Sequence, residues 1–239
     1  MGLTDWTGLS RAIHRWLPSQ CILCHAWPAQ TLCSACRLRF ARATARCLQC
    51  AQRVPQGILR CSACLRHPTP LESCVAAVDY AWPWADVVTQ FKFQARPDLA
   101  YALAALLQEA DGAQALLAQA DVLLPIPLAR DRLRERGYNQ ALLLARALCP
   151  QKTHAQWLLR THTTPAQSSL GRAQRLRNLH GAFALQPSAQ TTLKGARVLL
   201  IDDVMTTGAT LQTAAEMLHA QGAAHTSALV LARTPAPGA

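Results

Sequence analysis

Acidic residues are scarce in this 239-residue chain, and long apolar runs are missing from it. Asp and Glu number 13 against 24 Lys and Arg, which gives a formal net charge of +11. The longest apolar run, residues 99–107, is far shorter than the ~20 residues that a membrane-spanning helix needs. Arg11, His14 and Arg15 interrupt the N-terminal segment, which therefore lacks the apolar core of a secretory signal. We predict a cytoplasmic protein with no membrane span.

The cations are almost all arginine. Lysine contributes only 3 of the 24, and residues 1–70 carry nine arginines but one acid, Asp5. Because the arginine guanidinium matches phosphate geometry, this excess favours a polyanionic partner or a phosphate-bearing small molecule. A solubilising basic surface is the alternative, and charge alone does not decide between them. With 51% hydrophobic residues the chain has enough apolar material for a folded core.

Eight of the ten cysteines form four identical Cys-x-x-Cys pairs. The pairs are Cys21 and Cys24, Cys33 and Cys36, Cys47 and Cys50, and Cys61 and Cys64. Two such pairs supply the four thiolates of a tetrahedral zinc site, so the sequence predicts two structural zinc ions. A disulfide framework does not suit a reducing compartment, whereas iron–sulfur ligation stays open as an alternative.

Which pairs share an ion does not follow from their spacing. Sequential pairing, the first two pairs and then the last two, minimises the loop-closure entropy, but a crossed arrangement stays open. A module of about 45 residues buries little apolar surface, so the metal must supply its folding free energy. We therefore predict an N-terminal helix over 1–20, a zinc module over 21–70, a main domain over 71–235 and a tail over 236–239.

Short apolar runs alternate with amphipathic segments from residue 74 onward. Strands are expected over residues 74–81, 121–127, 157–162, 182–185, 196–202 and 225–233. Helices are expected over residues 84–94, 98–110, 138–149 and 210–222, the second with Asp98 as N-cap. This alternation predicts an α/β fold with a mainly parallel sheet.

The segment VLLIDDVMTTGAT, residues 198–210, joins an apolar strand to two adjacent aspartates. In a parallel sheet, ligands bind beyond the carboxyl ends of the strands, so Asp202 and Asp203 are expected at a ligand site. The turn that follows offers backbone N–H groups, a glycine and hydroxyls at a helix start, which suits a phosphate. Two carboxylates suit vicinal hydroxyls and can help to hold a divalent cation through water. The pattern predicts a ribose 5-phosphate ligand.

Residues 198–210 resemble the phosphoribosyl pyrophosphate (PRPP) motif of type I phosphoribosyltransferases. With the cysteine pairs and the segments FKF (91–93), LPIPLARDRLRERGYNQ (124–140) and TTPAQSSLGRAQRLRNLHGAF (163–183), the chain is similar to the ComF (GntX-like) family over about residues 21–233. The resemblance implies a phosphoribosyltransferase domain of type I preceded by a cysteine-rich zinc module. It also implies PRPP with Mg²⁺ as ligand and a role in DNA uptake by naturally competent bacteria.

The resemblance also implies roles for individual residues. PRPP is expected to bind Asp202, Asp203, Thr206, Thr207, Gly208, Ala209 and Thr210. In the loop expected after strand 121–127, Arg132 and Arg136 are expected to neutralise the pyrophosphate and, with the two aspartates, to form the catalytic set. A hood over the acceptor is expected to contain Gln167, Arg172, Arg177 and Asn178.

Two classes of function fit this sequence. The first is a phosphoribosyltransferase whose acceptor stays unassigned, because TTGAT lacks the carboxylate that some type I enzymes carry there. The second is a non-catalytic accessory protein that binds single-stranded DNA and DNA-uptake proteins, with the PRPP site as a sensor or a vestige. The intact aspartates and threonine loop favour the first hypothesis, and the arginine excess favours the second.

Overall fold

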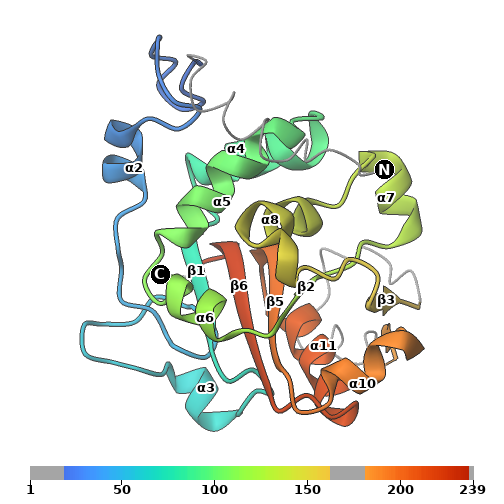
Figure 1. The fold of residues 1–239 in the computed structure, drawn as a ribbon. Coiled ribbons are helices and arrows are strands. Elements are labelled where there is room, and N and C mark those ends of the chain that lie inside the picture. Colours follow the sequence, from blue (N-terminus) through green and yellow to red (C-terminus); the bar gives the residue numbers. More distant parts are fainter. Residues whose placement is uncertain (1–18, 162–180, 237–239) are drawn as a thin grey trace. The chain divides into compact units, whose positions relative to one another are not determined.

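The computed structural model describes residues 19–161 and 181–236, and these fall into two compact units (Figure 1). The first unit spans Met1–Arg42 and the second spans Ala43–Ala239. The division lies inside the predicted zinc module, so the first two cysteine pairs belong to one unit and the last two pairs to the other. Nearly all of the expected N-terminal helix, the four hood residues and residues 237–239 of the tail lie outside the described residues. The predicted domain boundaries stay a prediction.

The first unit is organised around its cysteines. A backbone bridge joins Ser19 to Ala29, with Ser19 N–H donating to the Ala29 carbonyl at 2.9 Å. Helix α2 (Ser34–Phe40) begins after Cys33, whose sulfur accepts a hydrogen bond from the Cys36 amide at 3.4 Å. Because the sulfur serves as the helix cap, the fold of this short segment depends directly on the residues that can bind metal.

The second unit contains a four-stranded parallel sheet, which confirms the predicted fold class. Its strands lie in the order β1 (Cys74–Asp79), β6 (His225–Arg233), β5 (Arg197–Met205), β2 (Val122–Pro125). All three pairings are parallel. The carboxyl ends of the four strands therefore meet at one edge of the sheet (Figure 1).

Helices cover both faces of this sheet. One group consists of α4 (Trp84–Phe93), the 3₁₀ turn η1 (Pro97–Leu99), α5 (Ala100–Gln108), α6 (Ala113–Gln119), and α8 (Gln140–Leu148) with the short turn η2 (Pro150–Lys152). The second group consists of α11 (Ala209–Ala220), η3 (Pro187–Ala189) and α10 (Gln190–Leu193). α5, α6 and α8 contact the sheet strands in the first group, and α11 contacts β6 in the second.

A separate antiparallel pair, β3 (Leu158–Arg160) and β4 (Phe183–Leu185), flanks the residues 162–180. Two further short helices are α3 (Ser62–Arg66) and α7 (Arg130–Arg136). α7 corrects one expectation, because the basic segment after β2 is a helix and not a loop. It ends at Gly137, whose φ of 76° is the left-handed conformation that terminates helices.

A second expectation was wrong at Asp98. This residue lies inside the turn η1, and α5 begins after Leu99 with no side-chain cap. The Asp98 carboxylate instead pairs with the Arg96 guanidinium at 2.7 Å, because the turn before α5 brings the two side chains together. Pro97 at the start of η1 accounts for the turn, since its fixed φ suits a first helical position.

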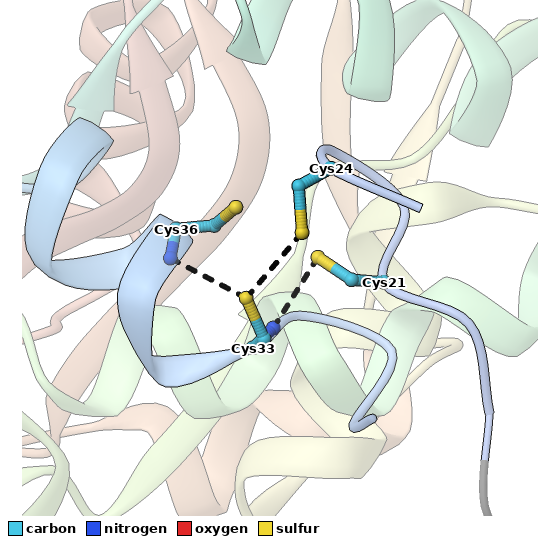
Figure 2. Close-up of side chains that lie close together, drawn as sticks. All are labelled: Cys21, Cys24, Cys33 and Cys36. Carbon is cyan, nitrogen blue, oxygen red and sulfur yellow. Dashed lines mark hydrogen bonds between the residues drawn. The ribbon is translucent and has the colours of Figure 1, made fainter. Parts of the chain in front are cut away.

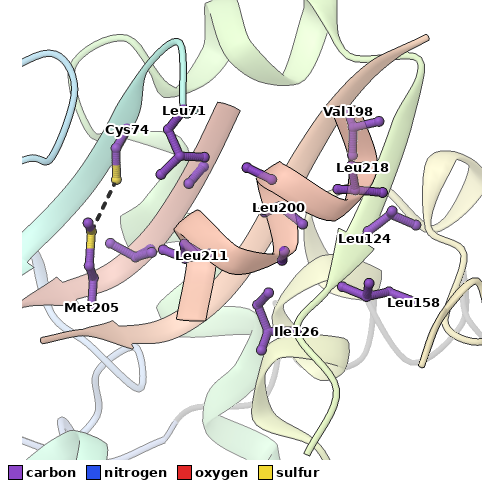
Figure 3. Close-up of a cluster of buried hydrophobic side chains, with 14 of the residues drawn as sticks. Leu71, Cys74, Leu124, Ile126, Leu158, Val198, Leu200, Met205, Leu211 and Leu218 are labelled. Carbon is purple, nitrogen blue, oxygen red and sulfur yellow. Dashed lines mark hydrogen bonds between the residues drawn. The ribbon is translucent and has the colours of Figure 1, made fainter. Parts of the chain in front are cut away.

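The apolar core on the α11 face combines alternate residues of the strands with one face of α11. Val198 and Leu200 of β5 and Leu124 of β2 meet Leu211 and Leu218 of α11 (Figure 3). Strand residues two apart share a face, so the other residues of the same strands face the opposite layer of helices. Both faces of β5 are buried up to Ile201, which fits the continuous apolar run in the sequence.

Candidate functional site

β5 carries the aspartate pair beyond the end of its neighbour β2. We expected the strand to end at residue 202, but it continues to Met205 because β6 pairs with it as far as Arg233. β2 stops at Pro125, opposite Ile201, so Asp202 is the first β5 residue without a β2 partner. The aspartates therefore stand at the carboxyl edge of the sheet, as predicted, but within a strand.

The position inside a strand determines where the two carboxylates point. Successive strand residues project to opposite faces, so Asp202 lies on the face of Leu200 and Asp203 on the face of Ile201. The Asp202 carboxylate accepts the Asp203 amide at 2.9 Å. The two carboxylates flank the strand, and a ligand that uses both must reach around its end.

Asp202 is held in an environment that disfavours its charge. Burial is the largest influence and, together with the adjacent Asp203 charge, raises the pKa of Asp202 to about 7. Lys92, the amide of Asp203 and Arg160 act in the opposite direction. A carboxyl group whose pKa lies near neutrality at a sheet edge is typical of a functional site.

Asp203 is paired with a lysine to which the sequence assigned no role. The Lys92 ammonium lies 2.9 Å from the Asp203 carboxylate, and the exposed fractions of the two side chains are 16% and 10%. Lys92 comes from α4, more than a hundred residues away in the chain. The FKF segment was part of the family resemblance, and this match was the only signal that could have indicated the lysine.

The two phenylalanines of FKF explain why Lys92 is held there. Phe91 is fully buried, and its carbonyl accepts the Tyr138 hydroxyl at 2.6 Å. Phe93 lies under the Arg136 guanidinium, 4.8 Å from the ring centre. The FKF segment therefore packs on the RERGYNQ segment. Lys92, which lies between the two phenylalanines in the sequence, is thereby directed toward β5.

α7 and β3 supply further cations. Arg132 and Arg136 are half-buried and four residues apart, so they share one face of α7, whereas Arg130 and Arg134 are exposed. Burial and the nearby Arg132 charge lower the pKa of Arg160, and Asp202 raises it, so these three charges are neighbours. The sequence assigned no role to Arg160.

The predicted phosphate loop connects β5 to α11. The Thr207 hydroxyl accepts the Ala209 amide at 3.4 Å, and the N-cap residue of α11, Gly208, makes no side-chain capping hydrogen bond. N–H groups without helical partners and the helix dipole at an N-terminus favour an anion. The loop Thr206–Thr210 is therefore a candidate anion site.

Gly208 is needed for the shape of the loop itself. Its φ of 81° is strained for other residues, and a Cβ there would lie 2.4 Å from the Met205 side chain. A side chain at this position therefore clashes with the protein itself, so substitutions at Gly208 do not isolate ligand binding.

The eight cysteines of the four Cys-x-x-Cys pairs form two quartets. The first two pairs make one quartet and the last two pairs make the other, which is the sequential pairing. The first quartet is Cys21, Cys24, Cys33 and Cys36 (Figure 2), and the second quartet is Cys47, Cys50, Cys61 and Cys64. Within each quartet all four sulfur atoms lie within 4.8 Å of one another, and every cysteine is a free thiol.

The sulfur spacing fits zinc. Metal–sulfur bonds of ~2.3 Å in a tetrahedron give sulfur–sulfur edges of ~3.8 Å. The separations are 3.7 Å between Cys24 and Cys33 and 3.7 Å between Cys50 and Cys61, which is far too long for disulfides. Burial and neighbouring thiols raise the pKa of Cys36 and of Cys64, a cost that a bound cation would remove. Each quartet can therefore hold a zinc ion.

The fold and the site define a phosphoribosyltransferase-like protein with two metal-binding cysteine quartets. The phosphoribosyl transferase domain family matches residues 155–238 of this chain. The match contains β5, the phosphate loop and α11, and it leaves out the cysteine quartets and α4.

Whole-length relatives extend the comparison. The DNA utilization protein YhgH of Shigella flexneri is 33% identical over 91% of this chain and 98% of its own length. Competence protein F of Haemophilus influenzae is 30% identical over 84% of this chain and 90% of its own length. A solved structure of the allosteric regulatory enzyme of purine biosynthesis is 17% identical, with a TM-score of 0.35 over 59% of this chain and 29% of that chain. The chain belongs to the ComF family.

None of the helices in residues 19–161 and 181–236 has the length and apolar character to cross a membrane.

Proposed function

We propose that this protein binds PRPP at the carboxyl end of β5. The observation that carries the proposal is the cluster of Asp202, Asp203 and Lys92 beside an uncapped helix N-terminus. In this assignment the phosphate loop Thr206–Thr210 accepts the 5-phosphate through its N–H groups and hydroxyls. The carboxylates accept hydrogen bonds from the ribose hydroxyls.

The cations around the aspartates suit the pyrophosphate end of the ligand. Lys92 neutralises Asp203 in the free protein and offers an ammonium group to an arriving phosphate. Arg132 and Arg136 share the half-buried face of α7 and are the proposed pyrophosphate ligands. Mg²⁺ bound with PRPP would neutralise further pyrophosphate charge, and the two carboxylates are suitable partners for its water ligands. The hood residues stay predictions.

Calorimetric titration of PRPP, with and without Mg²⁺, tests the proposal. The double variant Asp202→Asn/Asp203→Asn removes both charges from the ligand edge. Hydrogen bonds to charged groups contribute about 1.5–3 kcal/mol each, so affinity should fall roughly 100-fold or more. The matched control Asp86→Asn/Asp111→Asn removes two exposed acids elsewhere in the same unit and should bind PRPP like the parent. Equal binding by the parent and the site variant would reject the assignment.

We further propose that the bound PRPP is turned over with an acceptor that the site does not identify. Transfer of the ribosyl group to the acceptor breaks the bond to pyrophosphate, so pyrophosphate appears as product. Pyrophosphate release should be screened with nucleobases and with oligonucleotides. PRPP binding without release in any arm would favour a sensor site over an enzyme.

A second candidate function is handling of single-stranded DNA in the cytoplasm. Relatives named for DNA utilization and competence, and the net charge of +11, support this role. Binding through arginine releases counterions, so affinity for an oligonucleotide should fall steeply as salt rises. Absence of binding at low salt would remove the physical basis of this role.

We also propose that each quartet holds zinc in the native protein. Elemental analysis of the purified chain should find close to two zinc ions per molecule. Iron in place of zinc, or no metal, would overturn this assignment.

A further inference from the structure

Arg233, the last residue of β6, connects the second quartet to the phosphate loop. Its side chain is buried, with 6% exposed. The guanidinium donates to the Cys50 carbonyl at 2.8 Å, to the Met205 carbonyl at 3.1 Å and to the Thr234 carbonyl at 2.7 Å. It also donates to the carbonyl of Thr206. One side chain therefore joins a metal-binding cysteine to the first residue of the loop.

These contacts constrain the direction of the loop amides. In a trans peptide the C=O and the following N–H point in opposite directions. Because the Thr206 carbonyl points to Arg233, the N–H of Thr207 in the same peptide points away from it. Arg233 thereby helps to hold a donor in the direction that the proposed phosphate site needs.

The burial of Arg233 makes this arrangement specific. A buried guanidinium is costly unless it finds acceptors, and here Nε and Nη1 donate to four carbonyls. These carbonyls belong to three separate segments: the turn after Cys47, the end of β5 with the residue after it, and the residue after β6. A shift of the second quartet would move the Cys50 carbonyl, and the guanidinium would lose one of its partners.

Other contacts run along the same path. The Gln52 amide donates to the Thr234 carbonyl at 3.2 Å, next to the Arg233 contact. The Cys74 thiol contacts the Met205 sulfur at 3.6 Å (Figure 3). Three second-quartet cysteines, Cys47, Cys50 and Cys64, belong to the same buried cluster as Met205. The second quartet is thus part of the support beneath the loop.

We propose that Arg233 is a positioning residue that couples metal binding at the second quartet to phosphate binding at the loop. The inference rests on the proposed function, since it takes the loop as the PRPP phosphate site. Coupling between two sites is reciprocal in affinity, so PRPP must raise the metal affinity of the second quartet if the metal favours PRPP binding. We expect the higher affinity to appear as slower loss of the metal. The first quartet lies in the other compact unit, and none of the contacts described above involves it.

The test follows zinc transfer from the zinc-loaded full chain to a chromogenic chelator, with and without saturating PRPP. In the parent, PRPP should slow release of one ion at least about fivefold, the low end of typical coupling. The variant Cys36→Ser, which lacks the first site, should keep this slowing. Arg233→Met should lose it, and Arg233→Lys should retain part of it because one cationic donor remains. Slowing unchanged in Arg233→Met would overturn the coupling role.

Gln52→Ala keeps the test decisive if Arg233→Met does not fold. It removes only the neighbouring contact to Thr234, and it should reduce the PRPP-dependent slowing. If calorimetry shows that PRPP binds the parent and yet release of both ions is unaffected, the inference is wrong and the proposed function stands.

Hydrogen exchange tests the inference without PRPP. Chelating the metal of the Cys36→Ser protein should raise exchange in a peptide covering residues 205–210 more than in a peptide from α5. If PRPP does not bind the parent, the proposed function fails. Hydrogen exchange is then the only test of whether the second quartet supports the loop. Unchanged exchange after chelation would overturn that link.

Discussion

The two cysteine quartets have the same spacing within their pairs but different surroundings. The first quartet is held by local contacts, including the amide of Cys36 on the sulfur of Cys33, and Cys24 is exposed. The second quartet has three buried cysteines within the core that contains β5 and α11. Two ion pairs also tie its flanking arginines, Arg46 and Arg53, to Asp79 at the end of β1.

The difference indicates that the same spacing of metal-binding residues can have different structural consequences. An ion in the first quartet stabilises a short segment, because the described contacts there are local. An ion in the second quartet stabilises residues that also support the sheet edge with the aspartates. We therefore expect loss of the metal to destabilise only a short segment at the first quartet, but the whole second unit at the second quartet.

The largest expected effect comes from removing one ligand from each quartet in turn. Cys36 and Cys64 are a matched pair, because each is 5% exposed. Cys64→Ser should destabilise the second unit by more than about 4 kcal/mol, through loss of the metal and of core packing. Cys36→Ser should lose one zinc ion and leave the unfolding transition of the second unit unchanged. Denaturant unfolding followed by circular dichroism measures both, and equal effects would remove the contrast between the quartets.

A smaller effect is expected from Arg46→Gln. The Arg46 guanidinium lies 2.8 Å from the Asp79 carboxylate and donates to the Ala51 carbonyl at 3.1 Å, with 13% of the side chain exposed. Removing this charge leaves the mostly buried Asp79 carboxylate with less of its negative charge neutralised. The free energy of unfolding should fall by about 2 kcal/mol. The shift of the denaturant midpoint measures it. Zinc in the first quartet should be unaffected, and a loss there would contradict the division into two units.

The pH dependence of stability should also differ between the two regions. The folded pKa of Asp202, about 7, lies above the ordinary value of 3.8, so folding favours its protonated form. This contribution to stability is full below about pH 4 and is lost as the pH rises through about 7. Relative to Asp202→Asn, the parent should lose on the order of 4 kcal/mol over that interval, about 2 kcal/mol of it between about pH 5.5 and about 7.5. Residues 19–42 contain no Asp or Glu, so no carboxylate of the first quartet's segment titrates.

Denaturant midpoints of the two proteins at about pH 5.5 and about pH 7.5 measure about half of this change. Parallel curves for the parent and Asp202→Asn would show that the carboxyl group is ionised throughout.

The smallest effect is expected from Arg53→Gln. Arg53 pairs with the same carboxylate of Asp79 as Arg46, but 56% of its side chain is exposed. Solvent screening reduces the contribution of an exposed pair to less than about 1 kcal/mol. Unfolding at low and high salt should show a small, salt-sensitive change for Arg53→Gln. A loss of stability as large as that of Arg46→Gln would mean that the charge of the arginine, and not its burial, sets the strength of the two ion pairs with Asp79.

Much of the fold could be predicted from the local sequence pattern. The apolar runs at 74–81, 196–202 and 225–233 correspond to three parallel strands. In β5 and β6 the apolar run reflects burial on both faces, whereas in β1 buried and partly exposed residues alternate. The helical nature of 130–136 was missed, since its charged residues show no apolar stripe. Asp98 was misassigned because the capping rule ignores the turn that Pro97 begins.

For the candidate site, the sequence by itself determined which groups are present. Residue spacing alone indicated two sets of metal-binding thiols, and strand hydrophobicity placed Asp202 and Asp203 at a sheet edge beside a glycine-containing turn. These features depend on neighbours in the chain, so local patterns carry them. Only the tertiary structure decided that Lys92 of α4 meets Asp203, and that Arg233 joins Cys50 to the loop at Thr206. Those contacts join residues 27 to 183 positions apart with no periodic pattern between them, so only the packing of the sheet brings them together.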